Sequence, residues 1–238
     1  MESTAKVGGL AQRLGSVRAR IDECADRVGR SPNEITLVAV SKTHPPELIR
    51  EAIAAGVTDL GENRVQEAET KIPELRDAKV RWHLIGHLQS NKARRAVELF
   101  DVIHSVDSVS LAQRLERICH EVERAELPLM VQVDLGHEAT KTGADERDVP
   151  EIVACLKQSE RLRLVGLMTM PPFFDDPEKA RPFFRRLRNM RDELQRQGAF
   201  GEHRGELSMG MTHDYEIAIQ EGATILRIGT AIFGQRET

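Results

Sequence analysis

The chain is poor in aromatic residues, which make up 4% of it and include a single tryptophan and a single tyrosine, Tyr215. Cysteine is also rare, and the three cysteines, Cys24, Cys119 and Cys155, form no C-x-x-C pair. Each cysteine stands among apolar residues in a helical pattern. The odd count in such surroundings favours reduced thiols that serve as small core residues.

Long apolar runs are absent as well. No stretch approaches the roughly 18 apolar residues of a membrane-spanning helix, and the N-terminal M-E-S-T-A-K-V-G-G-L has no apolar core of a secretory signal. The 34 basic and 38 acidic residues leave a net charge of −4, which gives no reason to expect nucleic-acid binding. We therefore expect a cytoplasmic protein with neither membrane nor nucleic-acid partners.

Two fingerprint motifs are missing. No G-x-G-x-x-G follows the first apolar run, where a dinucleotide-binding fold needs one, and no G-x-S-x-G is present to carry a serine nucleophile. No linker or low-complexity segment divides the chain, so we predict a single domain over residues 1–238. The arginine-rich segment 181–191 fits either a docking surface for client enzymes or a solvated helix face.

What the sequence does contain is an alternation of short apolar runs and amphipathic stretches. The runs predict strands at residues 35–40, 57–60, 80–85, 102–106, 129–133, 162–168, 206–209 and 224–228. The amphipathic stretches predict helices at residues 46–55, 64–76, 91–100, 109–124, 146–158, 177–197 and 213–220, after an N-terminal helix at 10–28. About eight such units predict a (β/α)8 TIM barrel in the α/β class. Periodicity alone leaves an open doubly wound sheet as the alternative.

Lys42 follows the first predicted strand, in the segment V-A-V-S-K-T-H. A lysine at the end of a buried strand has a partly desolvated stem, and burial disfavours the charged ammonium form. Such an amine can be nucleophilic near neutral pH, as a Schiff-base lysine must be. The alternative is a lysine that simply extends from the strand end into water.

Two segments near the end of the chain suggest a phosphate site. Ser208 and Gly210 follow the seventh predicted strand, and Gly229 and Thr230 follow the eighth. Phosphate sites in TIM barrels commonly lie after these strands, where glycine allows close approach of backbone amides. With Lys42, this pattern indicates either a sugar-phosphate Schiff-base enzyme or a pyridoxal phosphate protein.

Arg227 lies two residues before Gly229, on the last predicted strand. An arginine pointing inward there could face the ring nitrogen of pyridoxal phosphate and leave it unprotonated, because guanidinium does not release its proton. The alternative is an ion pair with Asp59 or Glu62.

Three histidines, His83, His87 and His104, also stand at predicted strand ends. We expect no metal site there, since the H-x-x-x-H spacing of His83 and His87 falls on a strand and its turn, where it does not align two ligands.

These motifs together resemble the YggS/PROSC family of pyridoxal-phosphate-binding proteins, the pyridoxal phosphate homeostasis proteins. The matching segments are L-V-A-V-S-K-T at 37–43, G-E-N-R-V-Q-E at 61–67, W-H-L-I-G-H-L-Q-S-N-K at 82–92, H-S-V-D-S at 104–108, G-L-M-T-M at 166–170, E-L-S-M-G-M-T-H-D at 206–214 and R-I-G-T-A-I-F-G at 227–234. The resemblance covers the chain from about residue 10 to residue 234. It implies a barrel like the N-terminal domain of alanine racemase.

The resemblance also implies how the cofactor is held. Pyridoxal 5'-phosphate would be bound as an aldimine on Lys42, with its phosphate on Ser208 and on Gly229 and Thr230.

Around the ring, the resemblance places Arg227 at the pyridine nitrogen, Asn63 near the ring substituents and Met168 beside the ring. Two positions depart from the family pattern: Asp134 stands where asparagine is more common, and Thr212 stands where serine is usual.

A racemase with this barrel needs a second acid/base opposite the lysine. In alanine racemases, to which this barrel looks similar, a tyrosine of a separate C-terminal domain supplies it. Here Tyr215 falls in a predicted helix, and little sequence follows the last strand. We therefore expect a monomer that stores and delivers the cofactor without turnover, making at most transient contact with pyridoxal-phosphate-dependent apoenzymes. The alternative is an amino-acid racemase or Schiff-base lyase with an acid/base pair among Lys141, His83 and His104.

Overall fold

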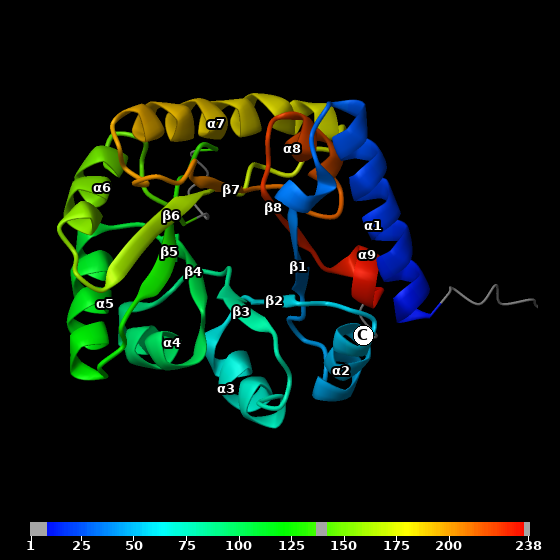
Figure 1. Ribbon diagram of the computed structural model, residues 1–238, viewed down its shortest axis with the longest axis horizontal. Coiled ribbons are helices and arrows are strands. Elements are labelled where there is room, and N and C mark those ends of the chain that lie inside the picture. The colour runs from blue at the N-terminus through cyan, green and yellow to red at the C-terminus, as the bar shows by residue number, and fades with distance from the viewer. Residues whose placement is uncertain (1–8, 137–141, 236–238) are drawn as a thin grey trace, which may run out of the picture.

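The computed structural model describes residues 9–136 and 142–235. Its eight parallel strands close into a barrel in sequence order, because the first strand pairs with the last. Helices surround the strands on the outside (Figure 1). The predicted (β/α)8 barrel is confirmed, and the open-sheet alternative is wrong.

The elements have the following bounds. The strands are β1 (Thr36–Val40), β2 (Asp59–Glu62), β3 (Arg81–Leu84), β4 (Val102–Val106), β5 (Leu127–Gln132), β6 (Leu162–Met168), β7 (Glu206–Ser208) and β8 (Ile225–Ile228). The α-helices are α1 (Leu10–Arg27), α2 (Pro46–Ala54), α3 (Val65–Glu74), α4 (Ala93–Leu99), α5 (Val109–Glu121), α6 (Val149–Lys157), α7 (Arg181–Arg196), α8 (Tyr215–Gln220) and α9 (Thr230–Phe233). Short 3-10 turns are η1 (Pro32–Glu34), η2 (Ser90–Lys92) and η3 (Pro177–Ala180).

Successive side chains of each strand point alternately to the helices and to the barrel interior. The outward set forms the main apolar core between strands and helices. The inward set includes a separate small cluster of Val38, Met130, Met168 and Ile225. The barrel interior is therefore packed with side chains, and a site can form only at its ends.

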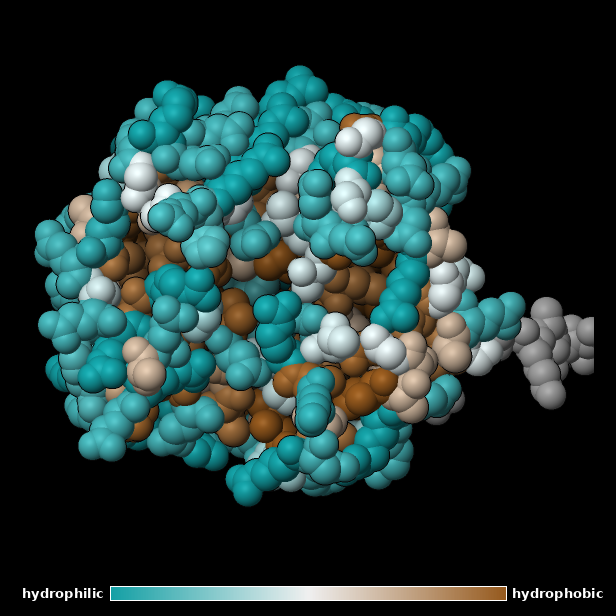
Figure 2. Space-filling model, viewed as in Figure 1, coloured by the Kyte–Doolittle hydropathy of each residue, from teal (hydrophilic) through white to brown (hydrophobic). Residues whose placement is uncertain are grey.

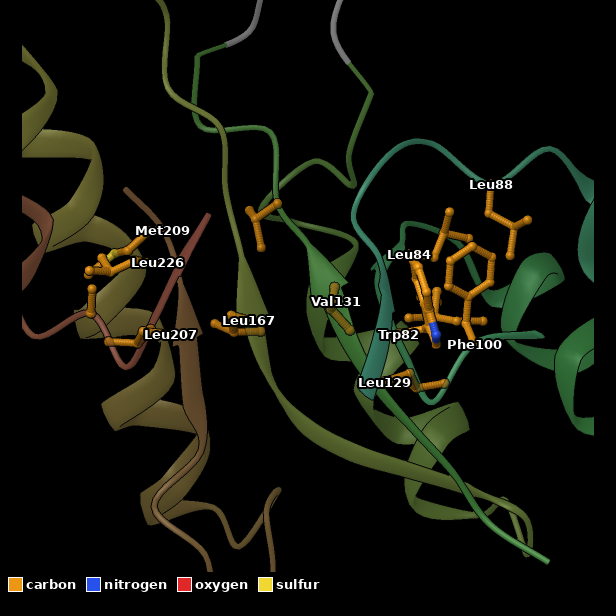
Figure 3. Packing of buried hydrophobic residues seen from close by; sticks show 14 of the residues in the cluster. Trp82, Leu84, Leu88, Phe100, Leu129, Val131, Leu167, Leu207, Met209 and Leu226 are labelled. Atoms are coloured by element: carbon orange, nitrogen blue, oxygen red, sulfur yellow. The ribbon is translucent and has the colours of Figure 1, made fainter. Parts of the chain in front are cut away.

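One part of the outer core lies between β3, β4 and α4. Trp82, Leu84, Leu88 and Phe100 point toward one another there (Figure 3), and none is more than 5% exposed. Burying each such side chain contributes about 1.5–3 kcal/mol. In Figure 2 apolar residues are visible in the middle of this face and are framed by polar residues of the surrounding helices.

Helix α1 packs outside the barrel, along α8 and α9 (Figure 1). Its buried residues include Leu10, Leu14, Val17 and Ile21, spaced three or four apart so that they lie on one face. The final turn, α9, was not predicted, because a helix of this length has no readable period. It begins at Thr230 and so starts within the predicted phosphate segment.

Strand β2 lies two residues later than predicted. The predicted bounds of 57–60 were wrong because Gly61 and Glu62 are part of the strand. A Cβ at Gly61 would lie 2.8 Å from Cγ1 of Val38, so the packed interior requires glycine. Glu62 is fully buried and pairs with Lys71 of α3. A buried charge of this kind is invisible to an apolar pattern.

The arginines of α7 meet a buried carboxylate. Glu221 is 3% exposed on its side chain, and Arg181, Arg185 and Arg188 all lie within 3.0 Å of its oxygens. This part of the arginine-rich segment therefore fastens α7 to the end of α8.

The three thiols are free, as predicted: Cys24 and Cys119 are buried and Cys155 is half-buried. Within the described ranges, the helices are all too short or too polar to cross a bilayer.

Candidate functional site

Lys42 sits in a tight turn immediately after β1. The amide of His44 donates to the carbonyl of Ser41 at 3.1 Å, which closes the turn around Lys42 and Thr43. Thr43 has a φ of 66°, a left-handed conformation that a β-branched residue rarely adopts. Such strain persists only where surrounding contacts hold the backbone in place, and it is typical of functional sites.

Those contacts come from α3 and the end of β2. Glu67 accepts from the amide of Thr43 at 2.8 Å, and the Lys71 ammonium donates to the carbonyl of Ser41 at 2.9 Å. The same ammonium lies 2.9 Å from Glu62, which also accepts from the Ser41 hydroxyl at 2.8 Å. Burial raises the pKa of Glu62. The turn is thus held on both sides of Lys42.

The end of β8 lies beside the end of β1. A Cβ built on Gly229 would lie 3.4 Å from both Cβ and the carbonyl oxygen of Val40, two residues before Lys42. The hydroxyls of Thr230 and Thr212 are 3.2 Å apart at this rim. Helix α9 has four residues, and the carbonyl of Gly229 already accepts from the amides of the third and fourth. The first two amides have no carbonyl partner within the helix. Two hydroxyls and these two amides form a donor set suited to a phosphate.

Ser208 lies away from that rim. It is fully buried, and its hydroxyl is 2.9 Å from Nδ1 of His104 and 2.6 Å from Nη1 of Arg227. The structure therefore separates the predicted phosphate partners: Thr230 is at the rim with Thr212, and Ser208 is in the barrel interior. From the sequence, Thr212 stood out only as a departure from the family pattern. Its hydroxyl nevertheless follows β7, where phosphate sites of TIM barrels commonly lie.

Arg227 points into the barrel from β8. Its Nη2 donates to the carbonyl of Thr169 at 2.9 Å, and the residue is 3% exposed. Burial lowers the pKa of Arg227 to about 10, against a smaller opposing effect of Asp214, so the guanidinium stays charged at neutral pH. The ion pair considered with Asp59 or Glu62 is wrong.

Those two carboxylates have other partners. Asp59 bonds to Arg81 and His83, and Glu62 bonds to Lys71.

The inner wall of this end combines apolar and polar groups. Met168 is fully buried in the interior cluster and pairs in register with Gln132 of β5. The amide oxygen of Gln132 is buried and has no hydrogen-bond partner among the described residues. Asn63 is half-buried just after β2, and its carbonyl lies so close to Gly86 that a Cβ there would be 2.1 Å away. An unmatched buried acceptor is the kind of group that a bound polar ligand satisfies.

The three histidines of the predicted strand ends lie in two different places. His83 and His104 meet inside the barrel, with ring nitrogens 2.9 Å apart, whereas His87 lies 3.5 Å from Asp107 at the surface. In the described part of the chain no three His, Cys, Asp or Glu side chains are placed to share a metal ion.

Tyr215 opens α8 and packs against the outer core. Burial raises the pKa of its hydroxyl, and the charged groups that affect it belong to α1 and α8. Asp134 follows β5 and accepts from the amide of Gly136 at 3.1 Å. Lys141 lies outside the described residues.

Comparison with known proteins decides the family. The model of the alanine racemase N-terminal domain matches residues 13–237. Pyridoxal phosphate homeostasis proteins of Aquifex aeolicus and Pseudomonas aeruginosa are 41% and 43% identical over 226 and 231 residues. These alignments cover 95% and 96% of this chain, and 98% and 96% of the relatives. The chain belongs to the pyridoxal phosphate homeostasis protein family.

Solved structures agree with this membership. The structure of PipY from Synechococcus elongatus PCC7942 with PLP bound has a TM-score of 0.83 and 43% identity, and covers 95% of this chain and 100% of that one. A D-threonine aldolase from Filomicrobium marinum has a TM-score of 0.73 at 15% identity, and the match covers 94% of this chain but 59% of the aldolase. That distant likeness concerns the barrel alone. The family resemblance inferred from the motifs is confirmed.

Proposed function

We propose that this protein holds pyridoxal 5'-phosphate through a Schiff base on Lys42 and serves in the intracellular storage and delivery of that cofactor. The observation that carries the proposal is the strained and doubly braced turn at Lys42, beside a hydroxyl pair and within a barrel whose last strand carries a buried arginine. The relatives' name and the PLP-bound PipY structure support the same cofactor.

The residues at this end fit the group. Thr212, Gly229 and Thr230 would hold its phosphate at the rim, and Lys42 would supply the amine. In the covalent step the Lys42 amine adds to the aldehyde carbon and one water leaves, so a C=N bond replaces the C=O bond. A phosphate held at Thr212 and Thr230 would limit which lysine amines the aldehyde can reach, which favours attachment at Lys42 over other lysines.

Deeper groups would contact the ring. Arg227 would face the ring nitrogen as a hydrogen-bond donor that does not release its proton to it. Met168 would provide an apolar wall, and Asn63 would lie near the ring substituents. The unmatched oxygen of Gln132 is a further acceptor on this wall.

The contacts within the barrel favour storage over turnover. Both ring nitrogens of His83 and His104 are engaged in internal hydrogen bonds, so neither imidazole is available to move a substrate proton. Tyr215 packs on the outer core. We propose that the protein acts as a monomeric single-domain carrier in the cytoplasm, with transient contacts to apoenzymes. An amino-acid racemase or lyase remains the second candidate only because the barrel is related to racemases.

The test is an absorbance spectrum of the purified protein supplied with pyridoxal phosphate, followed by borohydride reduction and peptide mass mapping. We expect a visible band and the added mass on Lys42. Lys42→Ala should lose both, while Lys92→Ala, a change at another half-buried lysine, should keep them. A colourless protein that binds no pyridoxal phosphate would contradict the proposal, and label on another lysine would contradict the site.

Turnover is tested separately. The loaded protein is incubated with amino acids in deuterated water, and the α-proton is followed by NMR. Exchange that disappears in Lys42→Ala would establish the second candidate in place of storage.

A further inference from the structure

Five buried polar side chains form one continuous hydrogen-bonded line through the barrel. Arg227 Nη1 is 2.6 Å from Ser208 Oγ, and Ser208 Oγ is 2.9 Å from His104 Nδ1. His104 Nε2 is 2.9 Å from His83 Nδ1, and His83 Nε2 is 2.9 Å from Asp59 Oδ1. Every member is at most 5% exposed, and each comes from a different strand: β8, β7, β4, β3 and β2.

The line has a single consistent direction when both imidazoles are neutral. Arg227 can only donate, so the Ser208 oxygen accepts from it, and the one Ser208 proton must then go to Nδ1 of His104. His104 consequently carries its own proton on Nε2 and donates to His83, which donates in turn to Asp59. Tautomers assigned in this way satisfy every donor with an acceptor.

The electrostatics of the line support a neutral His104 imidazole beside Arg227. Burial, together with His83 and Arg227, lowers the pKa of His104 well below its ordinary value. At the far end, burial alone would raise the pKa of Asp59, but hydrogen bonds from His83 and Thr58 hold it below its ordinary value. Asp59 is therefore an anion that accepts, and the charged Arg227 has no second cation next to it.

Among the described residues, the Arg227 guanidinium donates to two acceptors, the Ser208 hydroxyl and the carbonyl of Thr169. The carbonyl is part of the backbone and cannot turn, whereas a serine hydroxyl rotates freely unless its proton is committed. The orientation of the Ser208 lone pairs, and with it the plane of the guanidinium, therefore depends on His104.

We propose that His104 is a positioning residue: by accepting the Ser208 proton it keeps the Ser208 oxygen turned to Arg227 and so aims Arg227 at the ring nitrogen of bound pyridoxal phosphate. His83 and Asp59 keep His104 in the tautomer that accepts. This inference rests on the proposed function, since it concerns how that cofactor is recognised. It assigns Ser208 to the support of Arg227 and not to the phosphate.

The experiment compares two ligands that differ at one ring atom, pyridoxal 5'-phosphate and its 1-deaza analogue, in which carbon replaces the ring nitrogen. Dissociation constants are measured by equilibrium dialysis. We expect the unaltered protein to prefer pyridoxal phosphate by about tenfold, the effect of one hydrogen bond to a charged donor. His104→Leu should lose this preference. His104→Gln should keep most of it, because an amide can accept from Ser208 and donate to His83.

Equal weakening of both ligands in His104→Leu would show a merely structural role and overturn the inference, as would an unchanged preference. If His104→Leu does not fold, Ser208→Ala gives the same test, since it removes the oriented acceptor of Arg227. A retained tenfold preference in that variant would also overturn the inference. Failure of the proposed function is a different result, in which the unaltered protein binds neither ligand.

Discussion

Removing the buried ammonium of Lys71 should destabilise the protein strongly and in a pH-dependent way. Its partner Glu62 is fully buried, and Lys71 itself is 7% exposed. Lys71→Met keeps the side-chain volume but removes the ammonium. Oε1 of Glu62 then keeps only the hydrogen bond from the Ser41 hydroxyl, and Oε2 already has no partner in the described structure. Breaking such a pair typically costs about 3–5 kcal/mol, because it leaves an uncompensated buried charge.

The sign of the pH dependence follows from Glu62. Burial raises its folded-state pKa above the ordinary value of 4.5, so folding favours the protonated carboxyl. The stabilisation from this shift is full below about the ordinary pKa and is lost as the pH rises through the folded pKa. Without Lys71 the folded pKa rises further. The deficit of Lys71→Met should therefore be largest at neutral and alkaline pH and shrink toward pH 5, by about 1.4 kcal/mol for each pKa unit of added shift.

The assay is urea denaturation of the apoprotein between pH 5 and 8. The matched control is Lys79→Met, the same change at an exposed lysine, which should stay within about 0.5 kcal/mol of the unaltered protein. Adding Glu62→Gln to Lys71→Met should recover much of the loss, since no charge is then buried. A deficit below about 1 kcal/mol, or one independent of pH, would refute the reasoning that Glu62 is a desolvated anion held by Lys71.

Two further changes test other parts of the fold by the same denaturation assay. Gly210 has a φ of 95°, and a Cβ at this position would lie 2.6 Å from the Cβ of Ala218. At Gly198 φ is 70° and no atom lies within 4 Å of such a Cβ, so Gly198→Ala should lower the free energy of unfolding by roughly 1 kcal/mol. Gly210→Ala should lower it by more, because it adds a close contact to the backbone strain. Equal losses would argue against the close packing of α8 on β7. Glu221→Gln should cost about 2–3 kcal/mol at pH 7. Burial alone would raise the pKa of Glu221, but the hydrogen bonds and charges of the three arginines hold it below its ordinary value of 4.5. The contribution of Glu221 is therefore full above that value and is lost as the pH falls through the folded pKa. A variant whose stability still falls in parallel with the unaltered protein below pH 5 would contradict this assignment.

The barrel could be predicted from sequence because its strands are covered on both faces. Residues 36–40 and 162–168 are apolar enough to be recognised as buried parallel strands, and their alternation with amphipathic stretches predicts the eightfold order. Lys42, Arg227, Gly229 and Thr230 could be chosen as candidates because they follow or end such strands. Strand-end position is a property that the order of residues alone reveals.

The contacts among the site residues depended on the tertiary structure. Ser208 and Thr212 are four residues apart and both carry hydroxyls, so no local pattern distinguishes the one inside the barrel from the one at the rim. In the hydrogen-bonded line from Asp59 to Arg227, neighbouring members are as many as 104 residues apart in the sequence.

The sequence by itself determined the class of fold, the position of Lys42 after the first strand, and the family, because periodicity and motif spacing are local. Closure of β1 against β8 decided which inward side chains share the interior, and burial then decided their protonation and partners. A polar residue on a strand becomes a ligand contact, an ion-pair partner or a support for another side chain according to the neighbours that closure brings to it, and those neighbours are distant in sequence.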